Sequence, residues 1–201
     1  MARVSRLSSL DGLRGVAILL MVLDHVLVVG GFDHSPVRYT VTRVAMPVFM
    51  AISGALFSRV HWERWTRCLA AGLILPAVVA WIDNPNILVL WAFGVLVLRL
   101  LELLGQVLPR FRAALPWLVV VAVLTYAANR FGGALGSSGF EPLSVVALMV
   151  VGAQIGRERL SGALAAFARV PGWVRGIGRR PLAWYIGHLL VLVAVQRFGV
   201  L

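Results

Sequence analysis

The amino-acid sequence predicts an all-α fold, a polytopic bundle of about seven transmembrane helices with its N-terminus on the cytoplasmic side. Hydrophobic residues make up 60% of the 201 residues and charged residues only 13%, and the mean hydropathy is +0.90. Soluble domains are typically about 45–50% apolar and about 25% charged. The apolar residues recur in runs near the roughly 20 that a helix needs to cross the hydrocarbon. We therefore expect residues 1–201 to form a single integral membrane domain.

Seven apolar runs define the predicted helices. They lie at residues 10–31, 37–58, 67–82, 86–104, 114–129, 141–156 and 182–199. Several are short for a straight span, so tilting or local thinning of the bilayer is expected. Ser8, with Asp11 three residues later, can form a capping box that starts the first helix. Charged Asp11 and Arg14, and the lack of a clear small-residue cleavage site after this run, favour a retained helix over a cleaved signal sequence.

Three connections between the runs have a composition that predicts their structure. Residues 83–86, Asp-Asn-Pro-Asn, are typical of a tight turn, and the glycine-rich residues 132–139 predict a flexible loop. Residues 160–177 mix apolar side chains with arginines, Pro171 and Trp173. This mixture predicts one or two short amphipathic helices that lie along the cytoplasmic surface of the membrane.

The distribution of arginine predicts the orientation. The sequence contains no Lys, so all nineteen basic residues are Arg, and the formal net charge is +11. Most arginines lie in the N-terminal segment and in the second, fourth and sixth connections, whereas the connections of the other side hold only Arg38 and Arg130. The positive-inside rule then places the N-terminus inside and the C-terminus outside. The charge is therefore an orientation signal, and we expect membrane lipids as partners and no nucleic acid.

Ionisable side chains inside an apolar run are costly unless paired or hydrated, and they often mark function. The predicted runs contain Asp24, His25, Arg43, Arg99, Glu102 and His188. Arg99 and Glu102 are three residues apart, which favours an intrahelical ion pair. Asp24 is about 100° around the helix from His25, so the expected partner of this buried carboxylate is Arg43. Cys68, the only cysteine, is expected to be a small core residue, and no metal site is predicted.

Arg14 and His25 lie on one face of the first predicted helix. They are eleven residues apart, which places them within about 20° around the helix and roughly 16 Å apart along it. A cation at the membrane surface and a deeper imidazole would suit a long donor whose phosphates rest on the arginine while its reactive end reaches the histidine. Alternatively, Arg14 extends to lipid phosphates and His25 forms hydrogen bonds within the bundle. The spacing alone leaves both open.

Three segments of the sequence resemble the transmembrane acyltransferase superfamily. Residues 10–17, Leu-Asp-Gly-Leu-Arg-Gly-Val-Ala, running to His25, look like the opening of its members. Residues 43–54 resemble the Arg-x-x-x-Pro-x-Phe and Ser-Gly segment, and residues 185–188 resemble the Tyr-x-x-His signature. The superfamily includes the acyltransferase-3 sugar O-acetylases, the heparan glucosaminide N-acetyltransferases and the TraX-like pilin acetylases. The similar segments lie mostly at the two ends of the chain.

The resemblance implies a multi-pass enzyme of the bacterial inner membrane. It would move an acetyl or similar acyl group from cytoplasmic acyl-CoA to a lipid-linked sugar, a lipid or a membrane-protein acceptor. It implies His25 as the catalytic histidine and Arg14 as a contact of acetyl-CoA. Tyr185 and His188, three residues apart on one helix face, could orient a substrate or simply pack. Asp24 is a further candidate for the chemistry, and Arg43 for acceptor binding, although pairing between the two is the favoured interpretation.

The arginines before the last predicted helix are a second candidate for donor binding. Arg175, Arg179 and Arg180 lie in a glycine-rich stretch that could hold CoA phosphates through guanidinium groups and backbone amides. Orientation and lipid headgroup contact explain the same residues. Seven spans are fewer than acyltransferase-3 proteins usually have, so a second copy could be needed to close a tunnel, as a homodimer.

Two other functions remain compatible with the sequence. A small proton-coupled transporter or exporter could use Asp24, His25 and Arg43 as its binding cluster. A membrane scaffold without catalytic activity would need none of these residues for chemistry. Transfer of an acyl group that depends on His25 would distinguish the enzyme from both.

Overall fold

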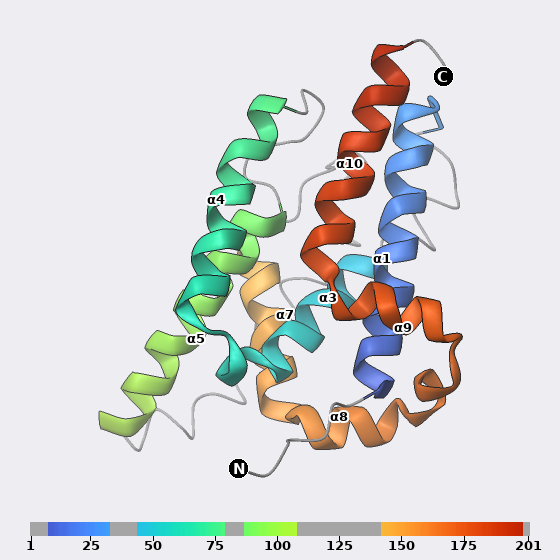
Figure 1. The fold of residues 1–201 in the computed structure, drawn as a ribbon. Helices are drawn as coiled ribbons and strands as arrows, with labels where there is room; N and C mark the ends of the chain where they lie inside the picture. The colour runs from blue at the N-terminus through green and yellow to red at the C-terminus, as the bar shows by residue number, and fades with distance from the viewer. Residues whose placement is uncertain (1–7, 33–43, 79–86, 108–141, 199–201) are drawn as a thin grey trace. The chain divides into compact units, whose positions relative to one another are not determined.

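The computed structural model describes residues 8–32, 44–78, 87–107 and 142–198, and these residues form helices and short connections. The all-α prediction is confirmed for this part of the chain (Figure 1). In order, the elements are α1 (Ser8–Val29), α3 (Ala45–Ala55), the 3-10 helix η2 (Phe57–Arg59), α4 (Trp62–Val78), α5 (Ile87–Val107), α7 (Pro142–Ile155), α8 (Arg157–Ala163), the 3-10 helix η3 (Ala165–Arg169), α9 (Gly172–Arg179) and α10 (Pro181–Arg197).

Two of the described helices are long and apolar enough to cross a bilayer, at Ser8–Val29 and Ile87–Gln106. Three described apolar helices are shorter, at Ala45–Ala55, Ser144–Ile155 and Pro181–Arg197. Six of the seven predicted runs contain a described helix, whereas the run at 114–129 lies outside the described residues. The turn at 83–86 and the loop at 132–139 lie outside them too. The number of spans and the orientation therefore stay predictions.

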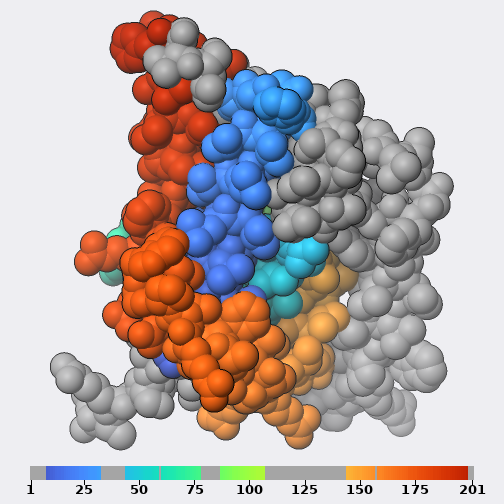
Figure 2. Space-filling view, turned by 90° about the vertical axis from the view of Figure 1, so that its right-hand side faces the viewer, coloured from blue at the N-terminus to red at the C-terminus, as the bar shows by residue number. Residues whose placement is uncertain are grey.

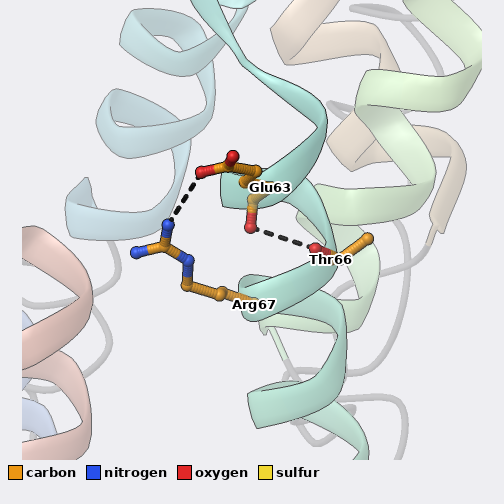
Figure 3. A network of polar contacts seen from close by, with 3 residues as sticks. All are labelled: Glu63, Thr66 and Arg67. Atoms are coloured by element: carbon orange, nitrogen blue, oxygen red, sulfur yellow. Dashed lines mark hydrogen bonds and ion pairs between the residues drawn. The ribbon is translucent and has the colours of Figure 1, made fainter.

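Helix α4 begins at Trp62, five residues before the apolar run that predicted it. The apolar run does not include the first turn of the helix, because that turn is polar. Figure 3 shows the contacts that stabilise this turn: Arg67 donates to Glu63 Oε2 at 3.1 Å, and the Thr66 hydroxyl donates to the Glu63 carbonyl at 3.0 Å. Pairs of opposite charge at i and i+4 support a helix by about 0.2–0.5 kcal/mol. Hydropathy could not detect this turn.

The chain forms two compact units, which are described separately. Unit 1 comprises Met1–Phe49 and Glu158–Leu201, and unit 2 comprises Met50–Arg157. In unit 2, α5 packs against both α4 and α7. The predicted ion pair of Arg99 and Glu102 is confirmed, with 2.9 Å between Arg99 Nη1 and Glu102 Oε2, and Cys68 is buried as expected.

In unit 1, α1 packs against η3, α9 and α10. Figures 1 and 2 show α10 running beside α1, with the segment before α10 covering the N-terminal part of α1. The core of this unit includes Leu10 and Ile18 of α1 and Leu189 of α10, all nearly inaccessible to solvent. A hydrogen bond of 2.6 Å joins the hydroxyls of Ser9 and Ser161. One face of α1 is therefore held along its length by the C-terminal part of the chain.

The segment predicted to be amphipathic, residues 160–177, forms the end of α8, η3 and most of α9. In α9, Val174 and Ile177 are buried, whereas Trp173 is 63% exposed. Short amphipathic structure is thus confirmed here, and its location at the membrane surface stays a prediction. Pro181 explains why α9 stops at Arg179: the α conformation is disfavoured for the residue before a proline, and proline is favoured in the first turn of the next helix. The helix breaks at Arg180, and α10 starts in a new direction.

Three glycines allow the backbones of unit 1 to come close together. A Cβ on Gly12 would overlap with the Phe167 carbonyl, and a Cβ on Gly15 with the Val174 carbonyl. Gly178 of α9 has the same relation to the carbonyl of Asp11. Since a backbone oxygen cannot move aside as a flexible side chain can, any larger residue at these positions must separate α1 from its partners.

We expect Gly178→Ala to lower the melting temperature of the full chain in detergent, by the equivalent of about 1–3 kcal/mol for overpacking. Gly176→Ala, on the same helix, is the matched control, because the space around Gly176 is open and alanine favours the helix. Equal melting temperatures for the two variants would contradict the close contact between α1 and α9.

Candidate functional site

Two imidazoles from opposite ends of the sequence meet in unit 1. Nδ1 of His25, on α1, lies 2.7 Å from Nε2 of His188, on α10, in a side-chain hydrogen bond. On its other side, Nδ1 of His188 donates to the carbonyl oxygen of Trp184 at 2.8 Å, one turn earlier in α10. The two histidines and this carbonyl therefore form a continuous chain of hydrogen bonds.

The two imidazole rings meet edge to edge. Their planes are 12° apart and their centroids are 5.1 Å apart. This separation is nearly the sum of the 2.7 Å nitrogen distance and the two ring radii, so the line between the nitrogens runs within both ring planes. A proton on one nitrogen then points directly at the in-plane lone pair of the other, which is the preferred hydrogen-bond geometry.

Tyr185 packs against both imidazoles. Its ring centroid is 5.6 Å from that of His188 and 6.4 Å from that of His25, with interplanar angles of 74° and 63°. Tyr185 is 7% exposed and His188 is 9% exposed, whereas His25 is half-buried. The expected shared face of Tyr185 and His188 is confirmed, and it is directed toward His25.

The contact between His25 and His188 was not predicted from the sequence. Each is an ionisable group inside a different apolar run, and no sequence pattern connects the two. The signal that could have paired them is that a polar ring in an apolar environment needs a hydrogen-bond partner. Few other candidate partners exist in the predicted runs.

The other end of the same face of α1 is charged. The Asp11 carboxylate lies 3.6 Å from the Nε of Arg179, on α9, and the Asp11 side chain is 7% exposed against 51% for Arg179. The sequence treated Arg179 as a candidate for donor phosphates and Asp11 as a helix cap. The structure places the two together, so part of the Arg179 guanidinium faces a carboxylate.

Arg14 and Arg175 lie beside the contact between α1 and α9. Each is next in sequence to a residue of the close contact between Gly15 and Val174, and each is half-buried with its Nε shielded from solvent. The Nε of Arg175 has no hydrogen-bond partner among the described residues. Arg180 is exposed at the break between α9 and α10. Two predicted groups of arginines, far apart in sequence, thus belong to one packed junction.

The proposed pairing of Asp24 with Arg43 falls partly outside the described residues. Asp24 is half-buried on α1, whereas Arg43 is not among the residues that the structure describes. Within the described ranges, no group of three or more His, Cys, Asp or Glu side chains could hold a metal ion.

Comparison with known proteins gives one family match. Residues 7–82 match the family model described as an acyltransferase domain. This segment contains Asp11, Arg14 and His25, whereas α9 and α10 lie beyond it. No curated protein matches the chain, and no solved structure does.

Proposed function

Because the match of residues 7–82 supports membership of the acyltransferase-3 family of membrane acyltransferases, we propose that this chain transfers an acetyl or similar acyl group from acyl-CoA to an acceptor at the membrane, with His25 as the general base. The observation that carries this proposal is the arrangement of α1. One end of its inward face meets arginines of α9, and the other end holds His25 in the hydrogen-bonded imidazole pair.

The reaction proposed for this site is acyl transfer from a thioester to a hydroxyl or an amine. The hydroxyl or amine of the acceptor gives its proton to the His25 imidazole while its oxygen or nitrogen forms a bond to the thioester carbonyl carbon. The carbon–sulfur bond then breaks, the acyl group stays on the acceptor, and the proton passes from His25 to the departing thiolate, which leaves as CoA thiol. General base catalysis of this kind typically contributes about 10²–10⁴-fold to the rate.

The arginines at the contact between α1 and α9, here called the arginine junction, are the proposed contact for the phosphates of the donor. Arg14, Arg175 and Arg180 would supply guanidinium groups, which bind phosphate through paired, charge-assisted hydrogen bonds. Arg179 would take part less fully, because Asp11 engages its Nε. Along α1 the distance from Arg14 to His25 is roughly 16 Å, which an extended CoA donor can span between its phosphates and its thioester.

The proposed acceptor is lipid-like. The side chains of Leu23 and Val26 flank His25 and are about 40% exposed, and Leu190 and Val191 follow His188 on exposed faces of α10. An acceptor anchored in the hydrocarbon could approach the imidazole pair past such side chains. A lipid-linked sugar, a lipid headgroup or a membrane-protein terminus fits this description, with Tyr185 and Arg43 as proposed acceptor contacts. Asp24 would have a supporting role beside the base.

The setting proposed for this activity is a multi-pass protein of the bacterial inner membrane with the arginine junction on the cytoplasmic side. That side supplies acyl-CoA. The family and the apolar helices suggest a membrane protein, and a homodimer is proposed as one way to enclose the donor.

Purified chain in lipid nanodiscs, given radiolabelled acetyl-CoA and a panel of lipid and lipid-linked sugar acceptors, is expected to form a labelled product. His25→Ala should lower the rate by at least about 100-fold, the contribution of a general base. His61→Ala is the matched control, because His61 is exposed in unit 2. A labelled product formed equally by both variants would exclude His25 as the base, and failure of the wild-type chain to bind acetyl-CoA would favour a transporter or a scaffold.

Arg14→Ala is expected to raise the KM for acetyl-CoA by about tenfold or more, with a smaller change in kcat. The reason is that the loss of a hydrogen bond to a charged group weakens binding of the phosphates in ground and transition states alike. Arg99→Ala is the matched control, since Arg99 pairs with Glu102 in unit 2. A fall in kcat at constant KM would contradict the phosphate role of Arg14.

A further inference from the structure

We propose that His188 is a positioning residue that selects which nitrogen of His25 acts as the base. In this proposal His25 carries its proton on Nδ1, where it is donated to His188, and keeps a lone pair on Nε2, which takes the proton of the acceptor. The catalytic meaning of this arrangement rests on the proposed function. The protonation pattern itself does not, because it follows from the two hydrogen bonds of His188.

The Trp184 carbonyl determines where the protons of both imidazoles lie. A carbonyl oxygen can only accept, so the Nδ1 of His188 that contacts it at 2.8 Å carries a proton. A neutral imidazole has a single N–H, so the Nε2 of His188 then presents a lone pair. The Nδ1 of His25, 2.7 Å from that lone pair, must be the donor. Each step fixes the next, and the last places the lone pair of His25 on Nε2.

The fold makes this order rigid. The Trp184 carbonyl belongs to the backbone of α10 and has two lone pairs, so it can accept from the His188 ring as well as from the helix. The edge-to-edge geometry of the two rings, with planes 12° apart, aligns the donated proton with its acceptor. Tyr185 packs against both rings at a steep angle, which restricts rotation of either ring. The orientation of His25 is therefore set from α10.

The consequence for catalysis resembles the role of the carboxylate in a Ser-His-Asp triad, where the carboxylate holds the histidine in the correct tautomer. When Nε2 of His25 takes the acceptor proton, the ring becomes an imidazolium whose Nδ1–H still points at the His188 lone pair. That hydrogen bond strengthens as the charge develops, because bonds from charged donors are stronger. His188 exchanges no proton with the substrate, so it acts through His25.

The direct test is ¹⁵N NMR of the full chain in nanodiscs with labelled histidine. The sequence has four histidines, and loss of one resonance set in His25→Gln and His188→Gln assigns the pair. The expected result near neutral pH is that both imidazoles are neutral and protonated at Nδ1. A proton on Nε2 of His25, or two protons on His188, would overturn the proposal.

Kinetics provide the second test. His188→Leu removes the acceptor for His25 and is expected to lower kcat by about ten- to 100-fold, the effect of losing one hydrogen bond to a charged group, with little change in the KM for acetyl-CoA. His188→Gln should recover much of the lost kcat, because its amide oxygen can replace Nε2 as acceptor. Gly187→Ala is the control, since the space around Gly187 is open.

The outcomes separate this inference from the proposed function. An active wild-type chain whose kcat is the same in His188→Leu and Gly187→Ala would overturn the positioning role while leaving the acyl transfer intact. An inactive wild-type chain with both imidazoles protonated at Nδ1 would overturn the acyl transfer while leaving the inferred tautomers intact. The NMR measurement on the wild-type chain decides the tautomers even where the leucine variant does not fold.

Discussion

Backbone carbonyls of η3 and α9 occupy the space that Gly12 and Gly15 leave open on α1, and Gly178 gives the same room to a carbonyl of α1. Small residues that allow such close approach are typical of helix contacts in membranes, where packing replaces the hydrophobic effect as the driving force. The rest of unit 1 depends on this contact. Because the helix breaks at Arg180, docking α9 on the first half of α1 leaves α10 to pack against α1 as well.

This packing explains how polar groups are accommodated on an otherwise apolar helix. Burying an unpaired polar group costs roughly 1–3 kcal/mol judged from mutational data on proteins, so each polar side chain on the inner face of α1 needs a partner. Arg179 provides one for Asp11, and His188 provides one for His25. The two pairs are roughly 21 Å apart along the helix. A single helix contact thus positions a charged end and an imidazole end on the same face.

The sequence was sufficient for features that depend on local patterns. Hydropathy located α1 and α5 well, and the i, i+3 spacing identified the pair of Arg99 and Glu102. The start of α4 was placed too late because a polar first turn held by Glu63 and Arg67 has no hydropathy signal. The break at Arg180 also has a local cause, because Pro181 follows it.

Features that depend on contacts between distant segments were not accessible in the same way. His25 and His188 are 163 residues apart in sequence, and no periodicity connects them. Arg179 was one candidate for donor phosphates, and its contact with Asp11 was not predicted because Asp11 lies at the other end of the chain. The resemblance to a family of acyltransferases identified His25 and Arg14, but it could not say that α10 sets the orientation of the histidine.

In the proposed function, one face of α1, closed by α9 and α10, holds an acyl donor from its phosphates to its thioester. Photo-crosslinking with an acyl-CoA that carries a diazirine in its acyl group, followed by mass spectrometric mapping of the labelled peptides, tests this most directly. The expected result is labelling near His25 on α1 and near Tyr185 on α10, suppressed by excess acetyl-CoA. Suppressible labelling confined to residues 50–157 would contradict it.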